Sequence, residues 1–277
     1  GFNLTGLFSF EWENKGYTED EFRLVHQLGY NFVRLPVDYR TYTAENWLTF
    51  DETSLQKIDH AIEWGQKYHV HVCLNLHRAP GYCVNKTQLP PDEDLDLWTD
   101  TIAQNVFYAH WKMFAERYET IPYEDLSFNL VNEPGETDSK IYSDIARRAI
   151  EIIHEVNPER LVMIDGLDYA REPVYELVNE KNVMQAFHMY DPFNITHYKA
   201  SWINGSDTWP SPVWPMHPFS SYLYGSHKAE YKSPLVVLGD FTAGTKVIVN
   251  VQQVSIRSRL VITGNSSTLF DKTLYSR

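Results

Sequence analysis

The chain has 277 residues, 43% of them hydrophobic, which is enough to bury a large core in one domain or in two smaller ones. A formal net charge of -13 at pH 7 argues against a nucleic-acid partner, whose phosphates need Lys and Arg, and against an anionic membrane surface. A neutral substrate fits this charge better. Eight Trp and 18 Tyr exceed what packing usually needs, which favours an aromatic-lined binding surface.

The cysteines and the apolar runs exclude further classes of protein. Cys73 and Cys83 are too few for a disulfide framework or a cysteine metal site, and Cys73 lies in an apolar run that favours a buried free thiol. No apolar run reaches the roughly 18 residues of a membrane-spanning helix, so no contact with a membrane is expected. No signal peptide is visible, but we expect the protein to act outside the cell.

Segments typical of strands and of helices alternate along the chain. The predicted strands are residues 2–7, 32–36, 69–76, 126–131, 160–165, 183–190 and 235–238. The predicted helices are residues 18–28, 51–68, 94–118, 137–156 and 174–179. This alternation predicts parallel strands with helical crossovers, and a (β/α)8 TIM barrel fits it best, as one catalytic domain over residues 1–277. An open doubly wound sheet is the alternative, but no Gly-rich phosphate-binding motif supports it.

Residues 241–277 differ in composition from the rest of the chain. They contain five basic residues and a single acid, Asp271, and no Trp. Residues 260–262 are the candidate eighth strand, and the 15 residues that follow are too few for a full closing helix. We therefore expect an atypical last βα unit, either incomplete or replaced.

One stretch joins an apolar strand to a polar tip. Residues 126–131 are followed by Asn132, Glu133 and Pro134. Pro134 fixes its own φ and biases Glu133 away from the helical region, so the strand is expected to stop there. In a parallel barrel this edge of the sheet carries catalytic groups. The alternative is a turn at the start of a helix with a solvated Glu133.

Further polar residues stand at the ends of other predicted strands, which a parallel barrel brings to one face. The whole set is Arg34, His77, Asn132, Glu133, His188, Tyr190 and Asp240. A protonated carboxyl that donates to a leaving oxygen, beside an ionised one that attacks carbon or activates water, suits hydrolysis of a glycosidic bond. Asn132 is a candidate to bind a sugar hydroxyl, and Arg34 to keep a carboxylate ionised.

Most members of this set also have a purely structural alternative. For Arg34 the alternative is a bridge between strand ends, and for His77 and His188 it is a histidine at the barrel mouth with satisfied hydrogen bonds. For Tyr190 the alternative is a place in the core, and for Asp240 it is the N-cap of a helix. Each signal is weak alone, and their shared position at strand ends favours the catalytic interpretation.

Aromatic side chains offer surfaces on which sugar rings stack. The candidates are Trp12, Tyr39, Tyr82, Trp202, Trp209 and Trp214. Packing within the fold is the alternative for any one of them. Residues 190–224 hold three of these Trp and five Pro with few strand or helix signals, which predicts a long loop that forms one wall of a cleft.

The motifs around these residues come in a fixed order along the chain. They are Arg34-Leu35-Pro36, Asn75-Leu76-His77-Arg78, Asn132-Glu133-Pro134, His188-Met189-Tyr190 and Gly239-Asp240-Phe241. From residue 1 to about residue 241 the chain thereby resembles glycoside hydrolase family 5, the cellulase-type group of retaining β-glycanases. The resemblance implies a (β/α)8 barrel, Glu133 as the acid/base, Asn132 in contact with the sugar at the −1 position, and neither metal nor cofactor. It also implies that Arg34, His77, His188 and Tyr190 surround that subsite.

Two positions depart from the family's pattern. Asp240 stands where the family has a Glu nucleophile. The shorter Asp side chain withdraws the carboxylate by about one C–C bond. The family usually has a Trp at the end of strand 8, and the last Trp here is Trp214.

The sequence as a whole predicts an endo-acting β-1,4-glucanase-like hydrolase for a neutral β-glucan. Glu133 and Asp240 are the predicted catalytic pair, and the predicted substrate-binding residues are Arg34, His77, Asn132, His188, Tyr190, Trp12 and Trp202. One alternative is a catalytically weak or inactive carbohydrate-binding barrel, which the Asp at position 240 supports. The other is a mannanase or another β-glycosidase of the same clan.

Overall fold

The structure is a computed structural model that describes residues 1–44, 47–85, 95–135, 137–190, 192–212, 243–244, 246, 248 and 257–275. The chain divides into two compact units, Gly1–Met189 and Tyr190–Arg277, and each is described by itself. The expectation of one catalytic domain over residues 1–277 stays a prediction.

The first unit is built on parallel strands that pair in the order β1-β2-β3-β5-β6-β7. Their bounds are β1 Phe2–Asn3, β2 Phe32–Asp38, β3 His71–Ala79, β5 Leu126–Asn129, β6 Val162–Asp165 and β7 Val183–Ala186. A short strand, β4 (Tyr82–Cys83), pairs antiparallel with the end of β3. Among the described strands β1 and β7 form the two edges of this sheet. The predicted seventh strand, residues 235–238, lies outside the described residues.

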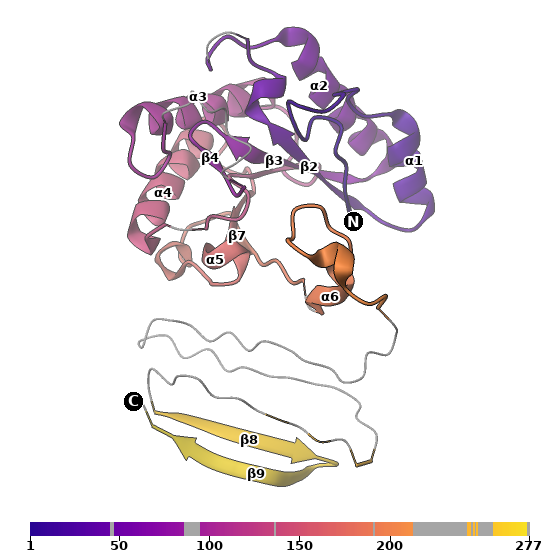
Figure 1. Ribbon diagram of the computed structural model, residues 1–277. Coiled ribbons are helices and arrows are strands. Elements are labelled where there is room, and N and C mark those ends of the chain that lie inside the picture. The colour runs from indigo at the N-terminus through magenta and orange to yellow at the C-terminus, as the bar shows by residue number, and fades with distance from the viewer. Residues whose placement is uncertain are drawn as a thin grey trace. The chain divides into compact units, whose positions relative to one another are not determined.

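Helices alternate with these strands and lie around them (Figure 1). The long ones are α1 Glu19–Gln27, α2 Glu52–Tyr68, α3 Thr101–Arg117 and α4 Ser139–Val156, and the short ones are α5 Leu167–Ala170, η1 Tyr39–Thr41 and η3 Tyr175–Leu177. The carboxylates of Asp51, Asp100 and Asp138 each accept a backbone N–H of the first turn, which explains where α2, α3 and α4 begin. The predicted alternation of strands and helical crossovers is confirmed over these residues. Within the described chain, no helix is both long and apolar enough to cross a membrane.

The core lies between the helices and the outer face of the sheet. Trp111 and Phe114 of α3 are fully buried, and the Trp111 ring lies 5.3 Å from that of Phe128 on β5. Strands β2 and β3 are buried along most of their length, as expected for parallel strands covered on both faces. Cys73 of β3 is a buried free thiol, as predicted, and burial raises its pKa to about 11.

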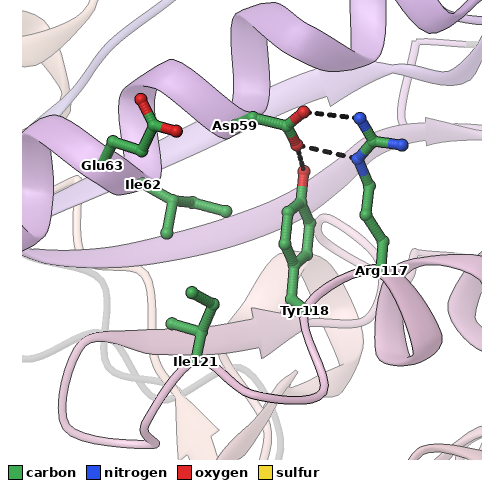
Figure 2. Close-up of a pocket in the computed structure, with 6 residues that line it drawn as sticks. All are labelled: Asp59, Ile62, Glu63, Arg117, Tyr118 and Ile121. Carbon is green, nitrogen blue, oxygen red and sulfur yellow. Dashed lines mark hydrogen bonds and ion pairs between the residues drawn. The ribbon is translucent and has the colours of Figure 1, made fainter.

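On the outside of the first unit, a hollow of about 330 Å³ lies between α2 and the end of α3 (Figure 2). Its polar wall is an ion pair: the Asp59 carboxylate accepts hydrogen bonds from Arg117 Nε at 2.8 Å and from the Tyr118 hydroxyl at 2.9 Å. Arg117 also pairs with Glu52 at the start of α2. These contacts join α2 to α3, so this hollow belongs to the packing of the helices.

The bounds of every predicted strand in the described residues differ from those observed at one end or both, and two of these differences place Arg34 and Glu133. Strand β2 continues through Pro36 to Asp38, because its parallel register with β3 runs on from Pro36 opposite Asn75 to Asp38 opposite Arg78. Arg34 therefore lies inside β2 and not at its end. Strand β5 ends at Asn129, before the predicted end at residue 131, and the chain reaches Glu133 in an irregular segment.

The second unit contains α6 (Phe193–Thr196), η4 (Ser206–Thr208), and a hairpin of β8 (Ser258–Gly264) and β9 (Ser267–Leu274). Residues 260–262 are a strand, as predicted, and their place as the eighth barrel strand stays a prediction. Within the second unit they pair antiparallel with β9. The sequence reason is the two-residue turn at Asn265 and Ser266, which both have positive φ, as hairpin turns of this length require.

Candidate active site

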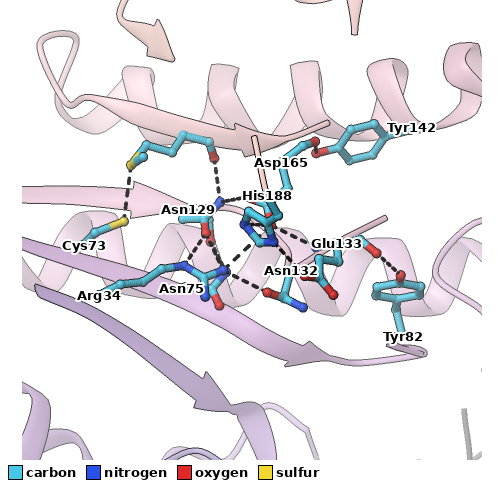
Figure 3. Close-up of polar contacts among 11 residues, drawn as sticks. Arg34, Cys73, Asn75, Tyr82, Asn129, Asn132, Glu133, Tyr142, Asp165 and His188 are labelled. Atoms are coloured by element: carbon cyan, nitrogen blue, oxygen red, sulfur yellow. Dashed lines mark hydrogen bonds and ion pairs between the residues drawn. The ribbon is translucent and has the colours of Figure 1, made fainter. Parts of the chain in front are cut away.

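Glu133 follows β5 in a backbone conformation that is unusual for its residue type. Its φ is +47°, in the left-handed region, which costs a residue with a side chain about 1–2 kcal/mol. The Glu133 N–H donates to Oδ2 of Asp165 at 2.9 Å, and the Tyr82 hydroxyl donates to the Glu133 carbonyl at 2.6 Å. Contacts on both sides of the residue therefore hold this conformation (Figure 3).

The Glu133 carboxyl lies against His188, which follows β7. Nδ1 of His188 and Oε1 of Glu133 are 2.7 Å apart and share a hydrogen bond, and both side chains are mostly buried. Nε2 of the same imidazole lies 3.4 Å from Oδ2 of Asp165. The ring thus stands between two carboxyl groups from two different strand ends (Figure 3).

Arg34 connects β2 to the segment before Glu133. Its Nε and Nη2 donate to Oδ1 of Asn129 at 2.9 and 2.8 Å, and Nη2 also donates to Oδ1 of Asn132 at 3.0 Å. Nη2 lies 3.8 Å from Asp165. Asn132 is buried, and its Nδ2 has no hydrogen-bond partner among the described residues. Arg34 thereby fixes the Asn132 side chain through its oxygen and leaves its two N–H donors for another group.

His77 lies on β3 beside the same network. Burial, followed by the positive charges of Arg34, Arg78 and His188, holds the pKa of His77 well below its usual value. The ring is therefore neutral at ordinary pH, and one of its nitrogens is a donor and the other an acceptor. Nδ1 is buried and has no hydrogen-bond partner in the described part of the chain.

The structure adds Asp165 to this site, a residue that the sequence interpretation missed. Asp165 is fully buried at the end of β6, and Oδ1 accepts from Asn129 Nδ2 at 2.9 Å. The signal was present, because Asp165 ends a predicted strand in the same way as the residues that were selected. Its low exposure and its position one strand from Glu133 only become visible in the fold.

One predicted aromatic platform extends from the site. The Trp12 side chain is exposed and its ring lies 4.9 Å from that of Phe8, which in turn lies 4.5 Å from the ring of His77. Tyr39 and Tyr82 were also candidates for stacking on sugars, but both are buried, so neither ring face is open to a ligand. Tyr82 instead uses its hydroxyl, which donates to the Glu133 carbonyl and accepts from the Gly135 N–H at 3.0 Å.

The loop that carries Tyr82 depends on a glycine. Gly81 has a φ of +74° in the tight turn between β3 and β4, and a Cβ there would lie 2.8 Å from the backbone nitrogen of Leu97. Burial raises the pKa of Tyr82, so its hydroxyl stays protonated and able to donate. The Pro80-Gly81 turn thus brings a hydroxyl donor to the backbone of Glu133.

Other predicted site residues are not placed in this network. Tyr190 and Trp202 belong to the second unit, where both rings pack on His197, at 5.1 and 6.2 Å. Asp240 and Trp214 lie outside the described residues. The roles of Tyr190, Trp202 and Asp240 stay predictions. In the residues that the structure describes, no group of three or more His, Cys, Asp and Glu side chains is arranged to hold a metal ion.

The described network can hold and move one proton at the end of the sheet. Glu133 offers a carboxyl with an imidazole in hydrogen-bond contact, and Asn132 adds amide donors that no described residue accepts. A carboxyl that exchanges a proton, with polar groups that orient a bound hydroxyl, is the arrangement expected of general acid–base catalysis.

Known proteins resemble this chain over most of its length. Residues 1–221 match the model of the family described as cellulase (glycosyl hydrolase family 5). Endoglucanase C of Acetivibrio thermocellus is 30% identical over 212 residues, which cover 73% of this chain and 60% of that protein. A probable glucan 1,3-beta-glucosidase A of Aspergillus clavatus is 29% identical over 186 residues, covering 65% of this chain and 43% of the other. The chain thus spans about 60% of the length of the first curated relatives it matches.

Solved structures show the same fold. A crystal structure of a glycoside hydrolase is 34% identical and superposes with a TM-score of 0.71 over 78% of this chain and 66% of that one. A hyperthermophilic endo-beta-1,4-glucanase is 24% identical with a TM-score of 0.60, over 74% and 64% of the two chains. The predicted α/β fold of the (β/α)8 barrel class is confirmed. The chain belongs to the cellulase family, glycosyl hydrolase family 5, as its motifs predicted.

Proposed function

We propose that this chain is an endo-acting β-1,4-glucanase-like glycoside hydrolase that acts on a neutral β-glucan outside the cell. The observation that carries the proposal is the Glu133 carboxyl in hydrogen-bond contact with His188, just after a parallel strand in a cellulase-family chain. The relatives named as endoglucanases support the choice of substrate. The net charge of -13 agrees with an uncharged sugar chain as the ligand.

The proposed reaction is a retaining double displacement. Protonated Glu133 donates to the leaving glycosidic oxygen while the Asp240 carboxylate attacks the anomeric carbon, which breaks the glycosidic bond and forms a glycosyl ester. Water then attacks the same carbon, Glu133 takes its proton, and the Asp240 carboxylate leaves. The shorter side chain of Asp240, compared with Glu, is expected to slow the first step.

The remaining residues are proposed to bind the sugar. The Nδ2 donors of Asn132 are proposed to bind a hydroxyl of the sugar at the −1 position, because their oxygen is already fixed by Arg34. His77 and Tyr190 are proposed to complete the polar lining of that position. Exposed Trp12 and Trp202 are proposed to stack on sugar rings, because the ring of a sugar has an apolar face.

A second candidate function is a carbohydrate-binding protein with little or no turnover, which the Asp at position 240 favours. The 1,3-beta-glucosidase relative favours testing other linkages as well. We expect the chain to lower the viscosity of a soluble β-1,4-glucan faster than it releases reducing ends, and to act less on β-1,3-glucan and on mannan. Binding of cello-oligosaccharides in calorimetry without release of reducing ends would select the second candidate. Absence of both binding and cleavage would contradict the proposal.

A further inference from the structure

The backbone of Glu133 is held from both sides by side chains of other strands. Asp165 accepts its N–H, and Tyr82 donates to its carbonyl, while φ is +47°. A residue in this region of φ relaxes to another conformation unless its surroundings hold it. The direction of the Glu133 side chain, and hence the place to which its proton is delivered, depends on this pair of contacts.

Among the described residues, the groups in contact with the Asp165 carboxylate are potential donors. Oδ1 accepts from Asn129 Nδ2, and Oδ2 accepts from the Glu133 N–H. His188 Nε2 lies 3.4 Å and Arg34 Nη2 3.8 Å from the same Oδ2. The carboxylate is fully buried, so these groups stand in place of solvent (Figure 3).

Asp165 therefore reaches the Glu133 carboxyl by two routes. One route is the Glu133 backbone, which it holds through the N–H. The other is the His188 imidazole, which has Asp165 beside Nε2 and Glu133 beside Nδ1. A carboxylate on one imidazole nitrogen fixes the ring's orientation and so the hydrogen bond made by the other nitrogen.

We propose that Asp165 is a positioning residue for the acid/base: it orients Glu133 through the Glu133 N–H and through His188, without touching the substrate. The inference rests on the proposed role of Glu133 as acid/base. It assigns to a buried strand-end carboxylate a part in directing the proton, in addition to filling space in the barrel interior.

A carboxylate is required here because both oxygens face donors. In Asp165→Asn, the side chain keeps its volume but presents an NH2 group either to Asn129 Nδ2 or to the Glu133 N–H. Two donors then face each other, so one of the two hydrogen bonds is lost. A space-filling role would tolerate this substitution, whereas a positioning role would not.

Tyr142→Phe is the matched control. The Tyr142 hydroxyl donates to the backbone carbonyl of Asp165 at 2.9 Å, so the variant removes a buried hydrogen bond from the same residue without changing its carboxylate. Tyr142→Phe therefore shares with Asp165→Asn any general loss of packing or stability around residue 165. It leaves both routes to Glu133 in place.

The test compares two aryl β-cellobiosides in the full chain. Phenol is a poor leaving group that needs protonation, whereas 2,4-dinitrophenolate leaves without it. For Asp165→Asn we expect kcat/KM to fall at least about 100-fold on the phenyl substrate and less than about tenfold on the dinitrophenyl one, as for loss of general-acid catalysis. Tyr142→Phe should lower kcat/KM on the two substrates by similar, small factors. Equal losses on both substrates in Asp165→Asn would overturn the proposal.

A second measurement tests the positioning without any turnover. In ¹H–¹⁵N NMR spectra, the Glu133 amide proton should resonate downfield in the wild type, because its acceptor is charged. It should move upfield in Asp165→Asn and stay in place in Tyr142→Phe. An unchanged Glu133 amide in Asp165→Asn would overturn the proposal. An upfield shift in a chain that cleaves neither cellobioside would support the positioning and contradict the proposed function alone.

Discussion

Nδ1 of His188 lies 2.7 Å from Oε1 of Glu133, although 55 residues separate them in the chain. The two residues follow the parallel strands β7 and β5, with β6 between them in the sheet. The hydrogen bond therefore exists only because the strands have this order and direction. It places an imidazole directly against the carboxyl of the proposed acid/base.

The contact predicts that His188 is needed for turnover. In His188→Ala, Glu133 loses the hydrogen bond that orients Oε1, and we expect kcat on an aryl cellobioside to fall about 100-fold. His60→Ala is the control, because His60 is exposed on the outer helix α2. The measurement is the steady-state kcat of both variants. A kcat of His188→Ala within about twofold of that of the control would contradict a role in catalysis.

For Asn132 we expect a loss of substrate binding and turnover without a loss of stability, because its Nδ2 donors have no partner in the described chain. In Asn132→Ala a bound sugar loses a hydrogen bond, and we expect kcat/KM on cello-oligosaccharides to fall by about 10- to 100-fold. The melting temperature should change little, because Arg34 keeps its two bonds to Asn129. A large loss of stability with unchanged kcat/KM would instead identify Asn132 as a structural bridge for Arg34.

His110 predicts how stability depends on pH. It is fully buried between the Tyr42 hydroxyl at 2.8 Å and the Trp47 carbonyl at 2.7 Å, and burial lowers its pKa from 6.5 to about 4. The unfolded chain therefore binds a proton before the folded one does, and stability falls as pH drops from about 6.5 towards 4. At pH 5 the loss from this residue is about 2 kcal/mol relative to neutral pH. His77, whose pKa is also lowered, adds a loss in the same direction.

The measurement is urea unfolding of the wild type and of His110→Gln at pH 7.5 and pH 5. Gln does not titrate, so the difference in unfolding free energy between the two pH values should be smaller by about 2 kcal/mol in the variant. His60→Gln, at an exposed position of α2, should retain the wild-type difference. The same pH dependence in His110→Gln and in the wild type would exclude His110 as its source.

Asp240 is the predicted nucleophile and lies outside the described residues, so kinetics must decide its role. Asp240→Glu restores the side-chain length that the family has, and we expect kcat to rise by up to about 100-fold, as for a correction of roughly 1 Å in the reacting distance. Asp240→Asn should abolish turnover. A fall in activity in Asp240→Glu would favour a capping role for this residue.

The sequence was most informative where a buried strand ends in polar residues. Such short apolar runs correctly predict parallel strands, and the polar residues Glu133, Asn132 and His188 that follow them lie in one network in the structure. Asp165 met the same criterion but was missed, since only the fold shows that its carboxylate faces Glu133. The sequence also suggests Tyr82 as a surface for stacking on sugars. Its burial is not visible in the sequence, because it depends on the turn at Gly81 and on contacts from distant segments.

The end of the chain shows a different limit. Residues 260–262 have the composition of a buried strand, but composition does not specify a strand's partner. The turn at Asn265 and Ser266 favours a local hairpin with β9 over a parallel pairing that would need a distant strand. Short-range turn geometry thus accounts for the pairing of β8 with β9, which the composition of residues 260–262 does not predict.

The most direct test of the whole account is the hydrolysis of phenyl β-cellobioside by Glu133→Gln. The variant keeps the shape of the side chain but cannot donate the proton that the phenolate needs, so we expect kcat/KM to fall at least about 100-fold. Glu63→Gln, on the outer helix α2, is the control and should match the wild type. A wild type that cleaves the substrate and a Glu133→Gln variant that cleaves it at nearly the same rate would contradict the assignment of Glu133 as the acid/base.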